Sequence, residues 1–139
     1  MNADMVKFYC FAQDIGRGVH DLNSDVLKIV LTDTAPVVTN TALTDITQIA
    51  SGNGYTTGGS IAASNTYAQV NGVAKLVATR VVFTATGAVG PFRYAVLYNN
   101  TASGKPLIGY WDYAAEVTMA NGEAFAVDID SVAGLLSVS

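Results

Sequence analysis

The sequence is poor in charge. Only 13% of its 139 residues are Asp, Glu, Lys or Arg, about half the share found in ordinary soluble proteins. The seven basic residues are scattered, and the formal net charge is −4. A protein that binds duplex DNA typically neutralises about six to ten phosphates with clustered basic side chains. We therefore expect neither direct nucleic-acid binding nor electrostatic attachment to a membrane.

Cysteine and long apolar runs are equally scarce. Cys10 is the only cysteine, which excludes an internal disulfide and a zinc site built from several thiolates, and its aromatic neighbours favour a small buried hydrophobe. No eighteen apolar residues follow one another, and the opening "MNADMVKFYC" lacks a continuous apolar segment. We expect a protein made in the cytoplasm that needs no cofactor.

Few residues are suited to catalysis. His20 in "GRGVHDLNSD" is the only imidazole, and the Gly-x-Ser-x-Gly motif is absent, so we expect His20 to pack or hydrogen-bond in a turn. Asp112 and Glu116 in "YWDYAAE" leave a small hydrolase as an alternative. Asp128 and Asp130 fit a solvated strand face better than a metal pair. The sequence favours a protein that is not an enzyme.

Short apolar runs, in contrast, are abundant. They span four to eight residues, are rich in Val, Ile, Thr, Tyr and Phe, and end at Gly, Asn, Asp or Pro, which is typical of strands. The chain length fits one domain. We predict a single all-β domain over residues 1–139, a jelly-roll-like β-sandwich with long Gly/Thr-rich loops. The predicted strands are Phe8–Ala12, Val26–Thr32, Ser60–Ala68, Val73–Ala78, Val81–Thr86, Phe92–Tyr98, Leu107–Tyr113, Ala115–Met119, Glu123–Asp130 and Leu135–Val138; a helical turn is predicted within Thr41–Ala50.

Two segments allow finer predictions. In "EVTMANGEAFAVDID", a three-residue loop with a left-handed Gly122 would pair Val117 with Phe125 and keep apolar residues on one face. In "GPFRYAVLYNN" both alternating faces carry apolar groups, which predicts a central strand covered on each side. One predicted face holds Phe92, Tyr94, Val96 and Tyr98, and the other holds Arg93, Ala95 and Leu97.

The stretch "SGNGYTTGGS", residues 51–60, contains four glycines but no lysine. A Walker-type phosphate loop needs that lysine, so a long hairpin loop is the better interpretation. Tyr110, Trp111 and Tyr113 could form an aromatic contact patch for sugar rings. Strand alternation divides them, however, because Trp111 and Tyr113 should face opposite to Tyr110.

Three quoted segments, "GNGYTTGG" (52–59), "GPFRYAVLYNN" (90–100) and "PLIGYWDY" (106–113), together with "KFYCFAQDIGRGVHDLNSDVLKIVLTDTAP", carry a resemblance. They resemble capsid decoration, or cement, proteins of tailed bacteriophages, over most of the chain from Lys7 to Val138. The family pattern often has a Gly-Asn turn where this chain reads Ala78-Thr79-Arg80. Whether residues 73–86 form one strand or two is therefore left open.

The resemblance implies a jelly-roll-like sandwich on the outside of an icosahedral capsid, made in the host cytoplasm, with the major capsid protein as its partner. A homodimer or homotrimer is expected. Asn53, Tyr55, Thr56 and Thr57 are the predicted interface in the glycine-rich loop, with Tyr55 as the anchor on a neighbouring subunit. Met5 and Val6 belong to a possible N-terminal arm, residues 1–6, that would add a strand to a capsid edge. The alternative is a carbohydrate- or receptor-binding module of a tail or head fibre.

Overall fold

The computed structural model describes residues 5–127 and 136–138. Strands account for 46% and helices for 9%, so the all-β prediction is confirmed. The strands are β1 (Val6–Lys7), β2 (Leu27–Thr32), β3 (Ser60–Ile61), β4 (Thr66–Val70), β5 (Val73–Val77), β6 (Val81–Thr84), β7 (Val89–Asn99), β8 (Leu107–Met119), β9 (Ala124–Val127) and β10 (Leu136–Val138); the helices are α1 (Tyr9–Gly16) and the 3₁₀ turn η1 (Leu43–Asp45).

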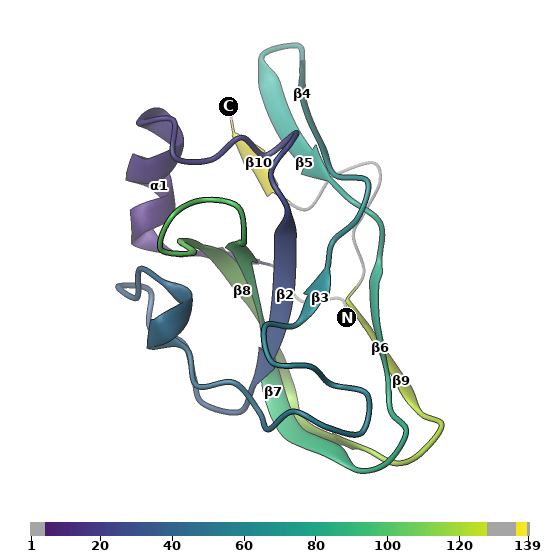
Figure 1. Cartoon of the computed structure of the whole chain (residues 1–139). Coiled ribbons are helices and arrows are strands. Elements are labelled where there is room, and N and C mark those ends of the chain that lie inside the picture. Colours follow the sequence, from purple (N-terminus) through teal and green to yellow (C-terminus); the bar gives the residue numbers. More distant parts are fainter. Residues whose placement is uncertain (1–4, 128–135, 139) are drawn as a thin grey trace.

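The strands form three antiparallel sheets. The largest has the order β1-β8-β7-β2-β3, and the smaller ones have the orders β10-β5-β4 and β6-β9. In Figure 1 the large sheet lies in the middle of the molecule, with α1 on one side and β6 and β9 on the other. This arrangement is consistent with a β-sandwich, whereas a jelly-roll connectivity stays a prediction.

The main core lies between the large sheet and the smaller ones. Leu31 of β2, Leu76 of β5 and Phe83 of β6 belong to one buried cluster. Phe92 of β7 meets Phe125 of β9 edge to face, with ring centroids 4.9 Å apart. Burial of such side chains supplies the main driving force for folding.

A second, smaller core covers the opposite face of the large sheet. Val30 of β2 and Val96 of β7 pack there with Phe8 and Ile46, which come from outside the sheet. Strand β7 is therefore buried on both faces, as predicted for a central strand. One assignment was wrong: Phe92 joins the main core with Ala95 and Leu97, because the register shifts between Phe92 and Tyr94.

The predicted strand Phe8–Ala12 was wrong, because the chain forms helix α1 from Tyr9. Its aromatic composition suggested a strand. In the helix, however, Phe11 and Ile15 are four residues apart, so they share one face and pack on the main core, while Tyr9 is exposed. The predicted helical turn near residues 41–50 is confirmed as η1.

Two predicted strand divisions change. Residues 60–68 contain the whole of β3 and the start of β4. The separate strands predicted at 73–78 and 81–86 are confirmed as β5 and β6, which answers the question left open for residues 73–86. The two strands predicted over 107–119 are one strand, β8. A left-handed residue within β8, Ala114 with φ of 68°, donates its N–H to Asp112 Oδ1 at 2.7 Å. The pairing with β7 shifts at this point, from Asp112 opposite Tyr94 to Val117 opposite Phe92.

The predicted pairing of Val117 with Phe125 was wrong. Val117 lies opposite Phe92 of β7, and Phe125 lies opposite Phe83 of β6. After β8 the chain crosses to the facing layer, where the N–H of Gly122 bonds to the carbonyl of Ala85 at 2.8 Å. Gly122 is left-handed as predicted, with φ of 87°. The end of the predicted strand, with Asp128 and Asp130, lies outside the described residues.

Candidate functional site

A two-residue turn connects the strands of the β4–β5 hairpin. Asn71 and Gly72 both have positive φ, 53° and 83°, which is the backbone that Asn-Gly favours in tight hairpins. Val70 and Val73 face each other directly next to the turn. The Gly72 N–H donates to the Gln69 side-chain oxygen at 3.1 Å. In Figure 1 the hairpin projects at the top of the molecule.

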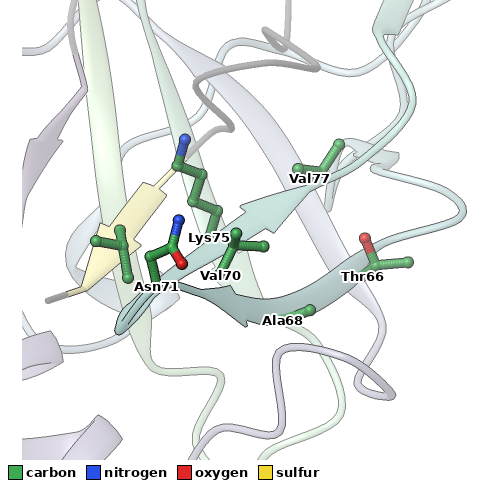
Figure 2. Close-up of a pocket in the computed structure, with 7 residues that line it drawn as sticks. Thr66, Ala68, Val70, Asn71, Lys75 and Val77 are labelled. Atoms are coloured by element: carbon green, nitrogen blue, oxygen red, sulfur yellow. The ribbon is translucent and has the colours of Figure 1, made fainter.

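The two faces of this hairpin differ. Leu76 is fully buried in the main core, and Tyr67 opposite it packs against the same core. The outward face consists of three cross-strand pairs: Thr66 with Val77, Ala68 with Lys75, and Val70 with Val73. These side chains and Asn71 line a shallow open groove of about 640 Å³ (Figure 2).

The groove is lined mainly by small uncharged side chains. Its seven lining residues include no acid, imidazole or thiol, and Lys75 is their only charged side chain. Val70 is 70% exposed. Small aliphatic and hydroxyl groups can exclude water against a complementary surface, but they hold no group that would move a proton near neutral pH.

Strand β4 is also an edge strand within the described part of the chain. The Tyr67 N–H donates to Asn23 Oδ1 at 3.1 Å, so Tyr67 and Gln69 direct their backbone groups away from β5. The sequence of β4, "TYAQV", contains no charge and no proline, and its pairing with β5 has no bulge. Natural edge strands usually carry a charged side chain, a proline or a bulge, because each of these discourages pairing with another chain.

The glycine-rich loop does not present Tyr55 to the outside, which corrects the prediction that Tyr55 anchors a neighbouring subunit. Its ring is 2% exposed. The hydroxyl accepts the Leu31 N–H at 3.2 Å and donates to Gln48 Oε1 at 2.9 Å. Burial raises the pKa of Tyr55 to about 12. The Gly58 carbonyl also accepts the Tyr98 hydroxyl at 2.6 Å, so the loop is fastened to its own domain.

The other predicted interface residues of this loop are exposed. Asn53 nevertheless donates from its side chain to the Ala88 carbonyl at 2.9 Å. Thr56 and Thr57 remain predicted contact residues. The loop lies at the opposite end of the molecule from the β4–β5 hairpin (Figure 1), so the two do not form one site.

The predicted N-terminal arm is corrected for its last residues. Val6 pairs with Tyr110 of β8, which makes β1 an edge strand of the protein's own sheet. The Met5 side chain lies over Gly109, where an added Cβ would come within 2.7 Å of the Met5 sulfur. Backbone pairing and this close packing hold both residues on the domain. Residues 1–4 lie outside the described residues.

The predicted aromatic patch is divided, as strand alternation indicated. Trp111 is 4% exposed and belongs to the main core. Tyr110 packs on the other face against Phe8, with ring centroids 5.3 Å apart. Tyr113 is 43% exposed and contacts Phe125 edge to face. These three rings therefore do not form one platform for a sugar.

The carboxylate considered for a hydrolase is held in an ion pair. Asp112 accepts two hydrogen bonds from Arg93, at 2.8 and 3.2 Å. The Arg93 side chain, followed by the Ala114 N–H, lowers the pKa of Asp112. A general acid needs a raised pKa, so this environment opposes that role. Glu116 is exposed on the same strand.

The remaining candidates for chemistry are packed into the structure. His20 is buried against Phe11 and hydrogen-bonded to Asn99, which confirms the expected structural role. Cys10 is half-buried, and burial raises the pKa of its thiol. Residues 5–127 and 136–138 contain no group of three or more His, Cys, Asp or Glu side chains that could hold a metal ion. None of the described helices is long and apolar enough to span a bilayer.

The chain matches no protein-family profile, no curated protein and no solved structure. The candidate site therefore rests on the residues themselves. Sequence reasoning did not identify the β4–β5 groove. The signal was present in "TYAQVNGVAKLV", where Asn-Gly separates two runs that place small aliphatic residues at alternate positions.

Proposed function

We propose that this protein is a structural virion protein that binds the outer surface of an icosahedral bacteriophage capsid and stabilises contacts between major capsid protein subunits. The observation that carries the proposal is the outward face of the β4–β5 hairpin. This face is aliphatic, carries one charge and adjoins an open strand edge. The resemblance of the quoted segments to capsid decoration proteins supports the choice of partner.

Two kinds of contact are available on this hairpin. The groove can bury Val70 and Val77 against apolar groups of the partner. The outward backbone groups of Gln69 can pair with an extended segment, because an edge strand accepts a further strand through main-chain hydrogen bonds. Both contacts need shape and backbone geometry rather than charge, which suits a charge-poor protein.

A modest contact suffices on a repeating lattice. A standard interface buries about 800 Å² per partner, and a single hairpin supplies part of that area. If copies associate as a homodimer or homotrimer, the second contact becomes intramolecular, and avidity rises by about a hundredfold or more. Exposed Thr56 and Thr57, at the other end of the molecule, can supply a separate contact with a neighbouring subunit.

The decisive experiment mixes purified protein with expanded capsids that lack it and measures co-sedimentation. We expect saturable binding with a fixed number of copies per capsid. Val70→Asp, which places a charge in the groove, should weaken binding at least tenfold. Val82→Asp is the matched control, because Val82 is also a strand valine and is 48% exposed, but lies on β6.

The outcomes separate the proposal from its alternatives. Absence of wild-type binding to capsids would refute the virion function. Wild-type binding that Val70→Asp leaves unchanged would refute the role of the hairpin alone. Binding to a glycan array without affinity for capsids would instead favour the carbohydrate- or receptor-binding module.

A further inference from the structure

His20 lies in a buried polar cluster at the end of β7. Its side chain is 8% exposed and packs against Phe11 of α1, with ring centroids 5.4 Å apart. Asn99, the last residue of β7, is fully buried, and its side-chain nitrogen lies 3.0 Å from His20 Nδ1. The same nitrogen lies 2.7 Å from Asp25 Oδ2. Two side chains of the segment 20–25 therefore meet one from the distant end of β7.

The hydrogen bonds fix the orientation of Asn99. Its Oδ1 accepts the backbone N–H groups of Thr101 and Ala102, at 2.9 and 3.0 Å. Its NH₂ group therefore faces His20 and Asp25, and each of its two hydrogens has one acceptor. Since Asn99 donates, His20 Nδ1 must accept, and the imidazole proton must be on Nε2.

This tautomer leaves one donor without a bond. His20 Nε2 is buried and has no hydrogen-bond partner in the described part of the chain. A buried donor without an acceptor carries a desolvation penalty. The neutral ring is thus held by the bond at Nδ1 and by packing, and the cluster is sensitive to any change at that nitrogen.

Protonation would place a hydrogen on Nδ1, directly opposite the Asn99 NH₂ group. Two donors would then face each other, and the bond could not persist. The charged groups whose fields reach the ring are Asp14 on α1 and Asp25 before β2, both acidic, whereas β7 presents the neutral amide of Asn99. The protonated ring would be drawn toward Asp25 Oδ2. That oxygen already accepts bonds from Asn99 and from the Asp21 N–H.

Residues 20–25, which contain His20 and Asp25, also contact the β4–β5 hairpin. The Asn65 side chain, just before β4, donates to the carbonyls of Leu22 and Asp25 at 2.6 and 3.1 Å. Asn23 Oδ1 accepts the outward N–H of Tyr67 in β4. Residues 20–25 therefore connect the His20 cluster to the edge of β4.

We propose that His20 is a pH switch. The neutral imidazole holds residues 20–25 against β7 and β4, and protonation of the ring releases them. Release frees the Tyr67 N–H and lengthens the open edge of β4. The inference stands on the geometry of the cluster and does not depend on the proposed virion function. Burial lowers the pKa of His20, although Asp14 and Asp25 oppose this effect. The ring is therefore neutral at neutral pH, and residues 20–25 stay in place.

The chain offers a direct measurement, because His20 is its only histidine. In isotope-labelled wild-type protein, ¹H–¹⁵N correlation at pH 7.5 should show a protonated Nε2 and an unprotonated Nδ1. On acidification to pH 5, the side-chain amide of Asn99 and the backbone amides of Asn23 and Tyr67 should shift with the same midpoint as the His20 ring. Amide exchange of Tyr67, corrected for its intrinsic pH dependence, should accelerate at least tenfold, while β8 stays protected.

The matched variant is His20→Asn, whose side-chain oxygen can accept from Asn99 but does not titrate. The shifts of Asn23 and Tyr67 between pH 7.5 and 5 should disappear in this variant. A proton on Nδ1 at pH 7.5, or a His20 titration that leaves Tyr67 unaffected, would overturn the proposal. Both measurements use the wild-type protein, so they decide the question even if the variant does not fold.

Discussion

Replacing Gly59 by alanine tests whether the glycine-rich loop is part of the folded domain. An added Cβ at Gly59 would lie 1.9 Å from the Ile29 carbonyl oxygen and 2.6 Å from its carbon. Ile29 pairs with Ser60 and is fully buried. The obstacle is therefore backbone inside a sheet rather than a side chain that could rotate away.

Two costs add up at this position. Gly59 has φ of +79°, and a left-handed backbone costs an L-residue about 1–2 kcal/mol. Forcing a methyl group into a filled space typically costs about 1–3 kcal/mol more. We expect Gly59→Ala to lower the free energy of unfolding by about 2–5 kcal/mol, a large share of the total for a domain of this size.

Gly72→Ala is the matched control. Gly72 also has positive φ, +83°, but nothing lies within 4 Å of an added Cβ. It should lose only the backbone cost of about 1–2 kcal/mol. Urea unfolding followed by the fluorescence of Trp111, the single buried tryptophan, measures both variants. Equal losses in the two variants would refute the tight packing of the loop on β2.

Three further substitutions test other contacts. Tyr55→Phe leaves the buried Leu31 N–H without its acceptor and should cost about 1–3 kcal/mol in urea unfolding; in the wild type, absorbance titration should show this phenol ionising near pH 12. Because Arg93 lowers the pKa of Asp112, the ion pair should stabilise the fold at neutral pH and lose this effect as pH falls through the lowered pKa. Thermal unfolding from pH 6 to 2 measures this acid dependence, which Asp112→Asn should abolish. Trp111→Ala should lower stability by about 3–5 kcal/mol in urea unfolding followed by circular dichroism, because the ring is in the core; an unchanged midpoint would place the ring on the surface.

Much of the fold follows from local patterns. The β-branched and aromatic runs predicted β2, β5 and β7 within a residue or a few of their observed ends, because each run is bounded by turn residues. Apolar residues on both alternating faces of β7 also predicted its central place. Such features depend on neighbours in sequence, so sequence reasoning can find them.

The errors arise where distant contacts decide. Alternation shows that Phe125 and Val127 share a face, but not whether β9 stays beside β8 or crosses to β6. The sequence around Tyr55 in the glycine-rich loop does not show whether its ring points outward or inward. Its burial depends on Leu31 and Gln48, which are 24 and 7 residues away. In the candidate site only the Asn71-Gly72 turn has a local sequence signal, because its backbone conformation depends on these two residues alone. The predicted interface residues did not include this turn.

The burial of β7 on both faces has a thermodynamic consequence. Ala95 and Leu97 belong to one apolar cluster, and Val96 and Tyr98, which alternate with them, belong to the other. Neither cluster can be exposed to water while this strand keeps its place in the sheet. The two clusters should therefore unfold together in one calorimetric transition, because β7 contributes side chains to both and couples them into a single cooperative unit.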